Sequence, residues 1–123
     1  MKKIITSVLV GGAIAASLLG AGAANAETAG QHNAVGKAES YLKYSGFSRQ
    51  GLIEQLEYEQ FSVADSTYAV DHVTVNWNAE AIEKAQSYLR YSSFSKSGLI
   101  EQLEYEGFTQ AQAQYGADTA YES

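Results

Sequence analysis

The residues that could do chemistry in this chain are chiefly glutamates and tyrosines, and one cluster of them occurs twice. The octapeptide LIEQLEYE spans Leu52–Glu59 and returns unchanged at Leu99–Glu106. Carboxylates can act in pairs as general acid and base, can bind a metal ion, or can form an acidic surface that a partner recognises. The rest of the sequence decides which of these uses is favoured.

The sequence lacks the groups that would complete a catalytic or metal site around these carboxylates. Its two histidines, His32 and His72, have no counterpart in the other copy of the repeat. Cysteine is absent, which excludes a thiolate nucleophile and a thiolate metal ligand. The other acidic residues are spread along the chain, as on solvated helix faces. We therefore predict a protein that is not an enzyme, with no cofactor, no metal and no small-molecule substrate.

The net charge narrows the class of partner. The chain carries 8 basic and 14 acidic residues, a formal charge of −6. Lys2 and Lys3 lie at the N-terminus and every acidic residue lies at or after Glu27, so the chain is more acidic still beyond its first residues. An acidic chain repels nucleic-acid phosphate and anionic lipid. We expect a protein partner and no nucleic acid.

The first 26 residues have the composition of a secretory signal peptide. Two lysines are followed by an apolar stretch from Ile4 to about Leu19 and by small residues ending Ala24-Asn25-Ala26. Signal peptidase requires small side chains at the first and third positions before the cut, which predicts cleavage after Ala26. The alternative is an uncleaved anchor, but residues 4–24 are only just long enough to span a bilayer and are rich in glycine and alanine, which insert weakly. We expect a secreted protein.

The remainder of the chain is an internal repeat. A shift of 47 residues aligns Lys37–His72 with Lys84–Thr119, and 22 of the 36 positions are identical. Aromatic residues keep their places in both copies, which indicates that the same core is built twice. Trp77 lies between the copies without a counterpart, and we predict that it joins them.

Each copy divides into three helical stretches. The first has apolar residues at spacings of three and four, and in the second copy Asn78 is the expected N-cap. Ser48 and Ser95 can cap the second stretch, and the third opens with Ser62-x-x-Asp65 or with the capping box Thr109-x-x-Gln112. The residues predicted to face inward in the first copy, with their counterparts 47 residues later, are Ala38, Tyr41, Leu42, Ser45, Leu52, Ile53, Leu56, Ala64 and Tyr68, and Phe61 and Phe108 are predicted as plugs between the second and third helices.

These stretches predict an all-α fold, a tandem repeat of two three-helix, helix-turn-helix-like modules packed together. A unit of fewer than roughly 40 residues rarely folds alone without a disulfide or metal, so we expect the modules to pack on each other or on a second molecule. Residues 116–123 are expected to be frayed. The predicted divisions are a signal peptide at 1–26, a flexible lead-in at 27–36, repeats at 37–73 and 79–121, and a junction at 74–78.

A helix-turn-helix suggests DNA binding, but the third helices argue against it. They would enter the groove, and their sequences SVADSTYAVDH and TQAQAQYGADT contain neither arginine nor lysine. The charge of the chain and its predicted export oppose DNA binding as well.

The polar half of the octapeptide has two interpretations. Its polar side chains either stabilise the helices through hydrogen bonds within and between modules, or form an acidic and aromatic surface for a partner. Neighbouring surface positions such as Gln50/Ser97 and Val63/Gln110 have diverged, so there has been time for unused polar positions to change. The candidate partner-binding residues are Glu54, Gln55, Glu57, Tyr58, Glu101, Gln102, Glu104 and Tyr105.

The segment YLKYSGFSRQGLIEQLEYEQFSVADSTYAVD and its partner YLRYSSFSKSGLIEQLEYEGFTQAQAQYGAD resemble the Ltp family, host cell surface-exposed lipoproteins of Gram-positive bacteria and their phages. The resemblance covers about Lys37 to Tyr121 and includes the Trp77-Asn78-x-x-Ala81 that opens the second copy. It implies tandem three-helix repeats displayed outside the membrane. In phage-borne members it implies superinfection exclusion, through a protein partner in the tail or injection apparatus of the incoming phage.

The sequence departs from this family at the N-terminus. The typical lipobox ends in a cysteine that is acylated, and the corresponding region LLGAGAANA has none. We therefore expect no lipid anchor, and a protein that is released or retained at the cell surface by other means. The alternative function is that of a wall-associated or secreted structural protein with no phage role, which a genomic location outside any prophage would favour.

Overall fold

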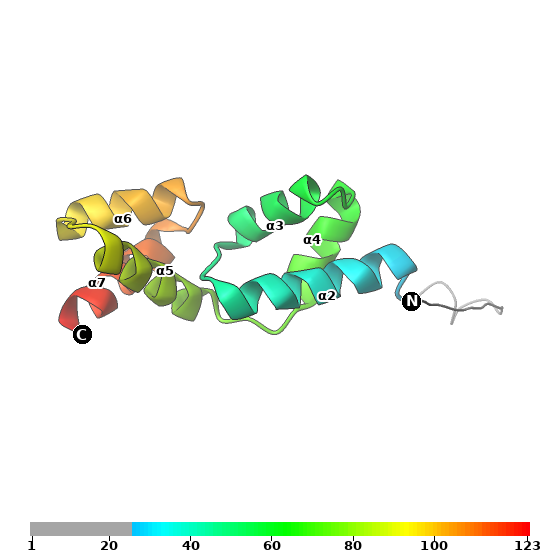
Figure 1. Cartoon of the computed structure of the whole chain (residues 1–123), viewed down its shortest axis with the longest axis horizontal. Coiled ribbons are helices and arrows are strands. Elements are labelled where there is room, and N and C mark those ends of the chain that lie inside the picture. Colours follow the sequence, from blue (N-terminus) through cyan, green and yellow to red (C-terminus); the bar gives the residue numbers. More distant parts are fainter. Residues whose placement is uncertain (1–25) are drawn as a thin grey trace.

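The computed structural model describes residues 26–123, and all regular structure in this part of the chain is α-helical. The predicted signal peptide lies outside the described residues, apart from Ala26. The helices form two groups of three, which follow one another along the long axis of the molecule (Figure 1). Helices α3 and α6 lie on the same side of the molecule. The predicted all-α fold of tandem three-helix modules is confirmed. The first module comprises α2 (Ala29–Tyr44), α3 (Arg49–Tyr58) and α4 (Val63–His72), and the second comprises α5 (Trp77–Tyr91), α6 (Lys96–Tyr105) and α7 (Gln110–Glu122).

Side-chain caps start the helices where the sequence indicates. The hydroxyls of Ser48 and Ser95 accept hydrogen bonds from the backbone N–H groups of Gly51 and Gly98, which begins α3 and α6. Thr109 forms the predicted capping box with Gln112 at the start of α7. These predictions are confirmed.

The predicted N-cap of α5 is wrong. Asn76, not Asn78, caps this helix, because its Oδ1 atom accepts a hydrogen bond from the N–H of Ala79 at 3.1 Å. The helix therefore begins at Trp77, and Asn78 lies inside its first turn.

The octapeptide ends in a turn that positions the two phenylalanines. The N–H of Phe61 donates to the carbonyl of Leu56, and the N–H of Phe108 donates to that of Leu103, both at 3.1 Å. These bonds, with Gln60 at φ 80° and Gly107 at φ 105°, form a Schellman ending that folds each phenylalanine back onto its own module. Phe108 is 4% exposed and Phe61 packs against the first core, so both predicted plugs are confirmed.

Each module has its own apolar core. Leu52, Ile53 and Leu56 lie in the first core, while Leu99 and Leu103 lie in the second. The predicted inward face of the third helix in each module is wrong, because Ala64 and Ala111 are exposed and Tyr115 is 51% exposed. The interpretation followed the two residues that both copies share, whereas the buried face is made of small residues that differ between the copies. These residues are Ser66, Ala69, Val70, Ala113, Gly116, Ala117 and Ala120.

The helices extend further at both ends than the sequence suggests. Helix α2 begins at Ala29 after a capping box at Thr28, and Ala34 is fully buried, so the segment 27–36 is not a flexible lead-in. Helix α7 continues to Glu122, with Ala120 buried. Alanines carry the core face in these segments, and their small side chains hide the apolar pattern while allowing close helix packing.

One ion pair is preserved between the copies although its basic residue differs. Arg49 contacts Asp71 at 2.7 Å between α3 and α4, and Lys96 contacts Asp118 at 3.2 Å between α6 and α7. The side chains are nearly half exposed, so each pair contributes little stability. Position 49/96 has therefore changed its residue while keeping its contact.

Candidate partner-binding site

The structure gives part of the octapeptide an internal role. The hydroxyl of Tyr41 on α2 donates a short hydrogen bond to the carboxylate of Glu59, and it accepts one from Nε2 of Gln55 at 3.1 Å. The Tyr41 ring meets Phe47 edge to face, with ring centroids 5.6 Å apart. This cluster fixes the end of α3 against α2.

The second module repeats the arrangement. Tyr88 donates to the carboxylate of Glu106 and accepts from Gln102 at 3.1 Å. Burial, with the Glu106 hydrogen bond as a second cause, raises the pKa of Tyr88 to about 12. These contacts account for the retention of Gln55 and Gln102 without any partner molecule.

The other polar residues of the octapeptide point outward in both copies. Glu54, Glu57, Glu101 and Glu104 are exposed. Tyr58 and Tyr105 are 80% and 87% exposed. Glu54 accepts a hydrogen bond from Gln50 at 2.8 Å, but Ser97 replaces that glutamine in the second copy, so this bond does not explain why both copies keep the glutamate. The exposed glutamates and tyrosines of the two octapeptides remain without an internal role in the described part of the chain, and we call them the acidic-aromatic residues.

The two modules meet at a narrow polar seam and do not share a core. The hydroxyl of Ser48, which caps α3, also donates to the backbone carbonyl of Glu106 at 2.6 Å. The N–H of Phe47 donates to Oε1 of Glu80 on α5 at 2.9 Å. Gly46 lies so close to α5 that a Cβ atom there would come within 2.7 Å of the carbonyl oxygen of Glu80. The modules are thus in contact as expected, chiefly through hydrogen bonds and closely approaching backbone.

Two further residues of α5 lie at the seam, Glu80 with a raised carboxyl pKa and Trp77 with an apolar contact. Burial raises the pKa of the Glu80 carboxyl; the Phe47 N–H opposes this rise and the neighbouring Glu83 adds to it. Trp77, the first residue of α5, packs against the core of the first module, which is the joining role predicted from its place between the copies.

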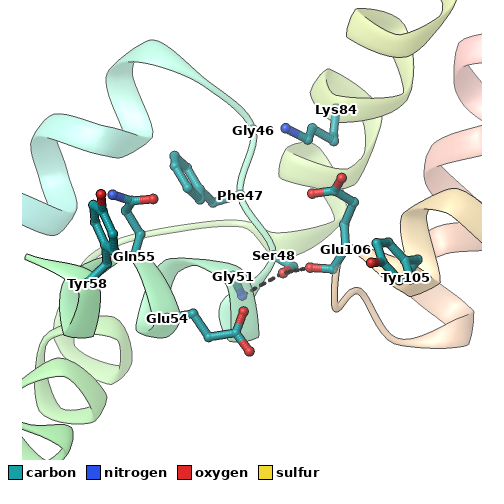
Figure 2. Close-up of a pocket in the computed structure, with 10 residues that line it drawn as sticks. All are labelled: Gly46, Phe47, Ser48, Gly51, Glu54, Gln55, Tyr58, Lys84, Tyr105 and Glu106. Carbon is teal, nitrogen blue, oxygen red and sulfur yellow. Dashed lines mark hydrogen bonds between the residues drawn. The ribbon is translucent and has the colours of Figure 1, made fainter.

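A cleft of about 470 Å³ opens at this seam (Figure 2). Its floor is the loop between α2 and α3, and each wall comes from a different copy of the octapeptide. Glu54, Gln55 and Tyr58 lie on the first-module side. Tyr105, Glu106 and Lys84 lie on the second-module side. The tyrosines stand on opposite sides of the floor in Figure 2.

Comparison with known proteins identifies the family to which the chain belongs. The family described as host cell surface-exposed lipoprotein matches twice, at residues 30–73 and 76–119. The chain belongs to this family. The structure of Ltp, a superinfection exclusion protein from the Streptococcus thermophilus temperate phage TP-J34, superimposes with a TM-score of 0.70 at 31% identity, covering 74% of this chain and 95% of that one. No curated protein sequence matches the chain.

The match to the lipoprotein family also redraws the repeat. The first match begins at residue 30 and the second at residue 76, seven and three residues before the predicted starts at 37 and 79. Sequence reasoning missed Ser48, Lys84 and Glu80 as seam residues. The only signal was the loss of glycine in the other copy, where Ser93 replaces Gly46 and Gln60 replaces Gly107.

The two histidines of this lipoprotein-family chain lie apart from each other in the structure. His32 lies 3.1 Å from Glu27, and His72 stacks on Tyr68, so the two histidines are held in separate local contacts. Within residues 26–123, no three histidine or acidic side chains converge as a metal site would require. In the same residues, no helix has the length and apolar character to cross a membrane.

Proposed function

We propose that this protein acts in superinfection exclusion and hinders DNA injection by a second phage through binding a protein of the tail or injection apparatus. The observation that carries the proposal is the match, across both modules, to a solved superinfection exclusion protein at 31% identity. Both proteins share the fold, and the chain covers nearly the whole length of that protein.

The acidic-aromatic residues supply the binding chemistry. They are repeated, exposed and without a shared internal role, in contrast to Gln55 and Glu59. The described region from Glu27 onward carries 14 acidic and six basic residues. Complementary charge speeds encounter and selects among partners, so a basic stretch of an injection protein would be attracted to this surface.

A phage challenge tests the proposal. Cells that express the protein should adsorb phage normally while DNA injection is blocked, as measured by adsorption counts and by the appearance of labelled phage DNA in the cytoplasm. The double variant Glu54→Lys with Glu101→Lys should lose this protection. Its helicity and melting temperature should stay close to those of the wild type, because both glutamates are exposed. Normal protection by the double variant would reject the acidic-aromatic residues as the binding surface, and unhindered injection with the wild type would reject the function.

Retention at the cell surface can be tested separately. Export by a cleaved signal peptide without a lipid would leave the protein dilute around the cell, whereas an anchor raises its local concentration. The variant Gly22→Cys creates a lipobox-like Leu19-Gly20-Ala21 followed by cysteine. We expect it to increase protection per molecule expressed. Equal protection would mean that the wild type is already held at the surface by another route.

A further inference from the structure

We propose that the cleft between the modules is the binding site for an extended, arginine- or lysine-rich polypeptide segment, with cationic side chains packed over the rings of Tyr58 and Tyr105. This inference rests on the proposed function and narrows it from the repeated outer surface to one place. The cleft is the place where the two copies of the octapeptide come together across the seam.

The two tyrosines are suited to cations. Their rings are 80% and 87% exposed and come from opposite walls of the cleft, so neither is needed to fill a core. An arginine or lysine side chain over a tyrosine face gains a cation–π interaction, and its apolar stem covers the ring. Tyr44 and Tyr91, which are equally exposed at 86% and 85%, do not line the cleft and provide a matched comparison.

The charges around the cleft favour the same occupant. Glu54 and Glu106 line it, and Glu83 lies behind the floor, where its Cβ would be 3.3 Å from a Cβ at Gly46. The cation of the lining, Lys84, lies 5.8 Å from the centroid of the Tyr88 ring, on the second-module wall. Carboxylates therefore outnumber cations in the lining, which attracts a basic segment and repels an acidic one.

The polarity of the cleft disfavours a small apolar ligand. A volume of about 470 Å³ lies within the roughly 300–1,000 Å³ of typical ligand pockets, but the walls are mostly polar rather than apolar. Gly46 and Gly51 contribute only backbone atoms to the lining. A short length of extended polypeptide fits these features.

The cleft breaks the symmetry of the repeat, and this gives a sharp test. Glu54 lines the cleft, but its counterpart Glu101 and the equally exposed Glu57 do not. Glu54→Lys, Glu101→Lys and Glu57→Lys change the net charge by the same amount. A cleft site predicts that only the first is severe, whereas binding along the whole repeated surface predicts similar losses for all three.

The experiment measures binding of a fluorescein-labelled peptide of repeating Arg-Gly-Ser to the purified protein by fluorescence anisotropy. Glu54→Lys should weaken binding about tenfold, and Glu101→Lys and Glu57→Lys less than about twofold. Tyr58→Ala with Tyr105→Ala should weaken it by roughly two- to fivefold, and Tyr44→Ala with Tyr91→Ala should not. Circular dichroism checks that every variant is folded.

Two results would overturn the cleft assignment. Equal losses for the three lysine variants would return binding to the repeated outer surface and leave the proposed function intact. If the wild-type protein did not bind the peptide, the proposal that the cleft binds a basic segment would be rejected. In either case the phage challenge judges the proposed function independently, because it needs no peptide.

Discussion

Tyr41 and Tyr88 explain at the scale of single residues why a polar sequence can be repeated without a shared partner molecule. Each hydroxyl satisfies one glutamate, 18 positions away along the chain, and one glutamine, 14 positions away. Removing such a hydroxyl leaves partly buried polar groups without a partner, which costs more than the bond itself gains. Selection for stability therefore suffices for Gln55 and Glu59, and only the acidic-aromatic residues require a different explanation.

The raised pKa of Tyr88 predicts how stability changes at alkaline pH. An unfolded tyrosine loses its proton near pH 10, whereas Tyr88 keeps it in the folded protein up to about 12. Between these values the unfolded state binds fewer protons than the folded state, so the free energy of unfolding falls as the pH rises. Below pH 10 the contribution is fully present. Urea unfolding from pH 7 to pH 12 should show this decline.

A phenylalanine variant isolates the residue responsible. Tyr88→Phe should unfold more easily at pH 7 by about 1 kcal/mol, because Glu106 and Gln102 lose their partner. Its stability should then decline less steeply above pH 10 than that of the wild type. Tyr105→Phe, at an exposed position, should match the wild type throughout. An unchanged alkaline slope in Tyr88→Phe would show that other groups cause the decline.

At the scale of helices, the modules differ in how closely their first and third helices pack against each other. Gly116 on α7 lies against Ala81 on α5, and a Cβ atom there would come within 2.8 Å of the Ala81 Cβ. The first module has Ala69 at the equivalent place, fully buried between its own helices. The equivalent position thus accommodates a Cβ atom in the first module, whereas in the second module a Cβ atom would meet the facing helix.

Two glycine substitutions test this close packing. Gly116→Ala should destabilise the protein by about 1–3 kcal/mol, because α5 and α7 would have to move apart. Gly36→Ala, in α2 with no neighbouring atom within 4 Å of the added Cβ, should stabilise it by roughly 0.5–1 kcal/mol. Thermal melting of both variants checks the signs. A stabilising Gly116→Ala would mean that α5 and α7 separate at no cost.

How much of the structure could be predicted from the sequence depends on how far apart along the chain the interacting residues lie. The caps at Ser48 and Thr109 and the inward leucines could be predicted, because they depend on residues three or four positions apart. The reach of α2 back to Ala29 could not, since alanine forms its core face and carries little apolar signal. The acidic-aromatic residues were found because they repeat. The approach of Glu54, Tyr58 and Tyr105 to one cleft could not be predicted, because the seam depends on contacts such as Ser48 with Glu106, 58 positions apart.

At the scale of the whole molecule, comparing alanine substitutions at Ser48 and Ser95 measures how much the seam contributes to the free energy of unfolding. Both cap a helix, but only Ser48 also donates to the other module, through the Glu106 carbonyl. Ser95→Ala should cost about 1 kcal/mol for the lost cap. Ser48→Ala should cost about 1 kcal/mol more, because a hydrogen bond between the modules is lost as well. Equal losses in urea unfolding would mean that the seam contributes nothing to stability.

Separate cores joined by so few contacts should behave as two cooperative units, as in repeat proteins whose stability is a sum of unit and interface terms. Leu103→Ala opens a cavity in the second core and should destabilise that module by about 2–5 kcal/mol. Amide hydrogen exchange should then accelerate throughout α5, α6 and α7 while protection in α2, α3 and α4 falls only by the share that the seam supplies. Leu56→Ala should give the mirror result. If both variants accelerated exchange equally in all helices, the modules would form one folding unit, and the cleft between them would be as rigid as either core.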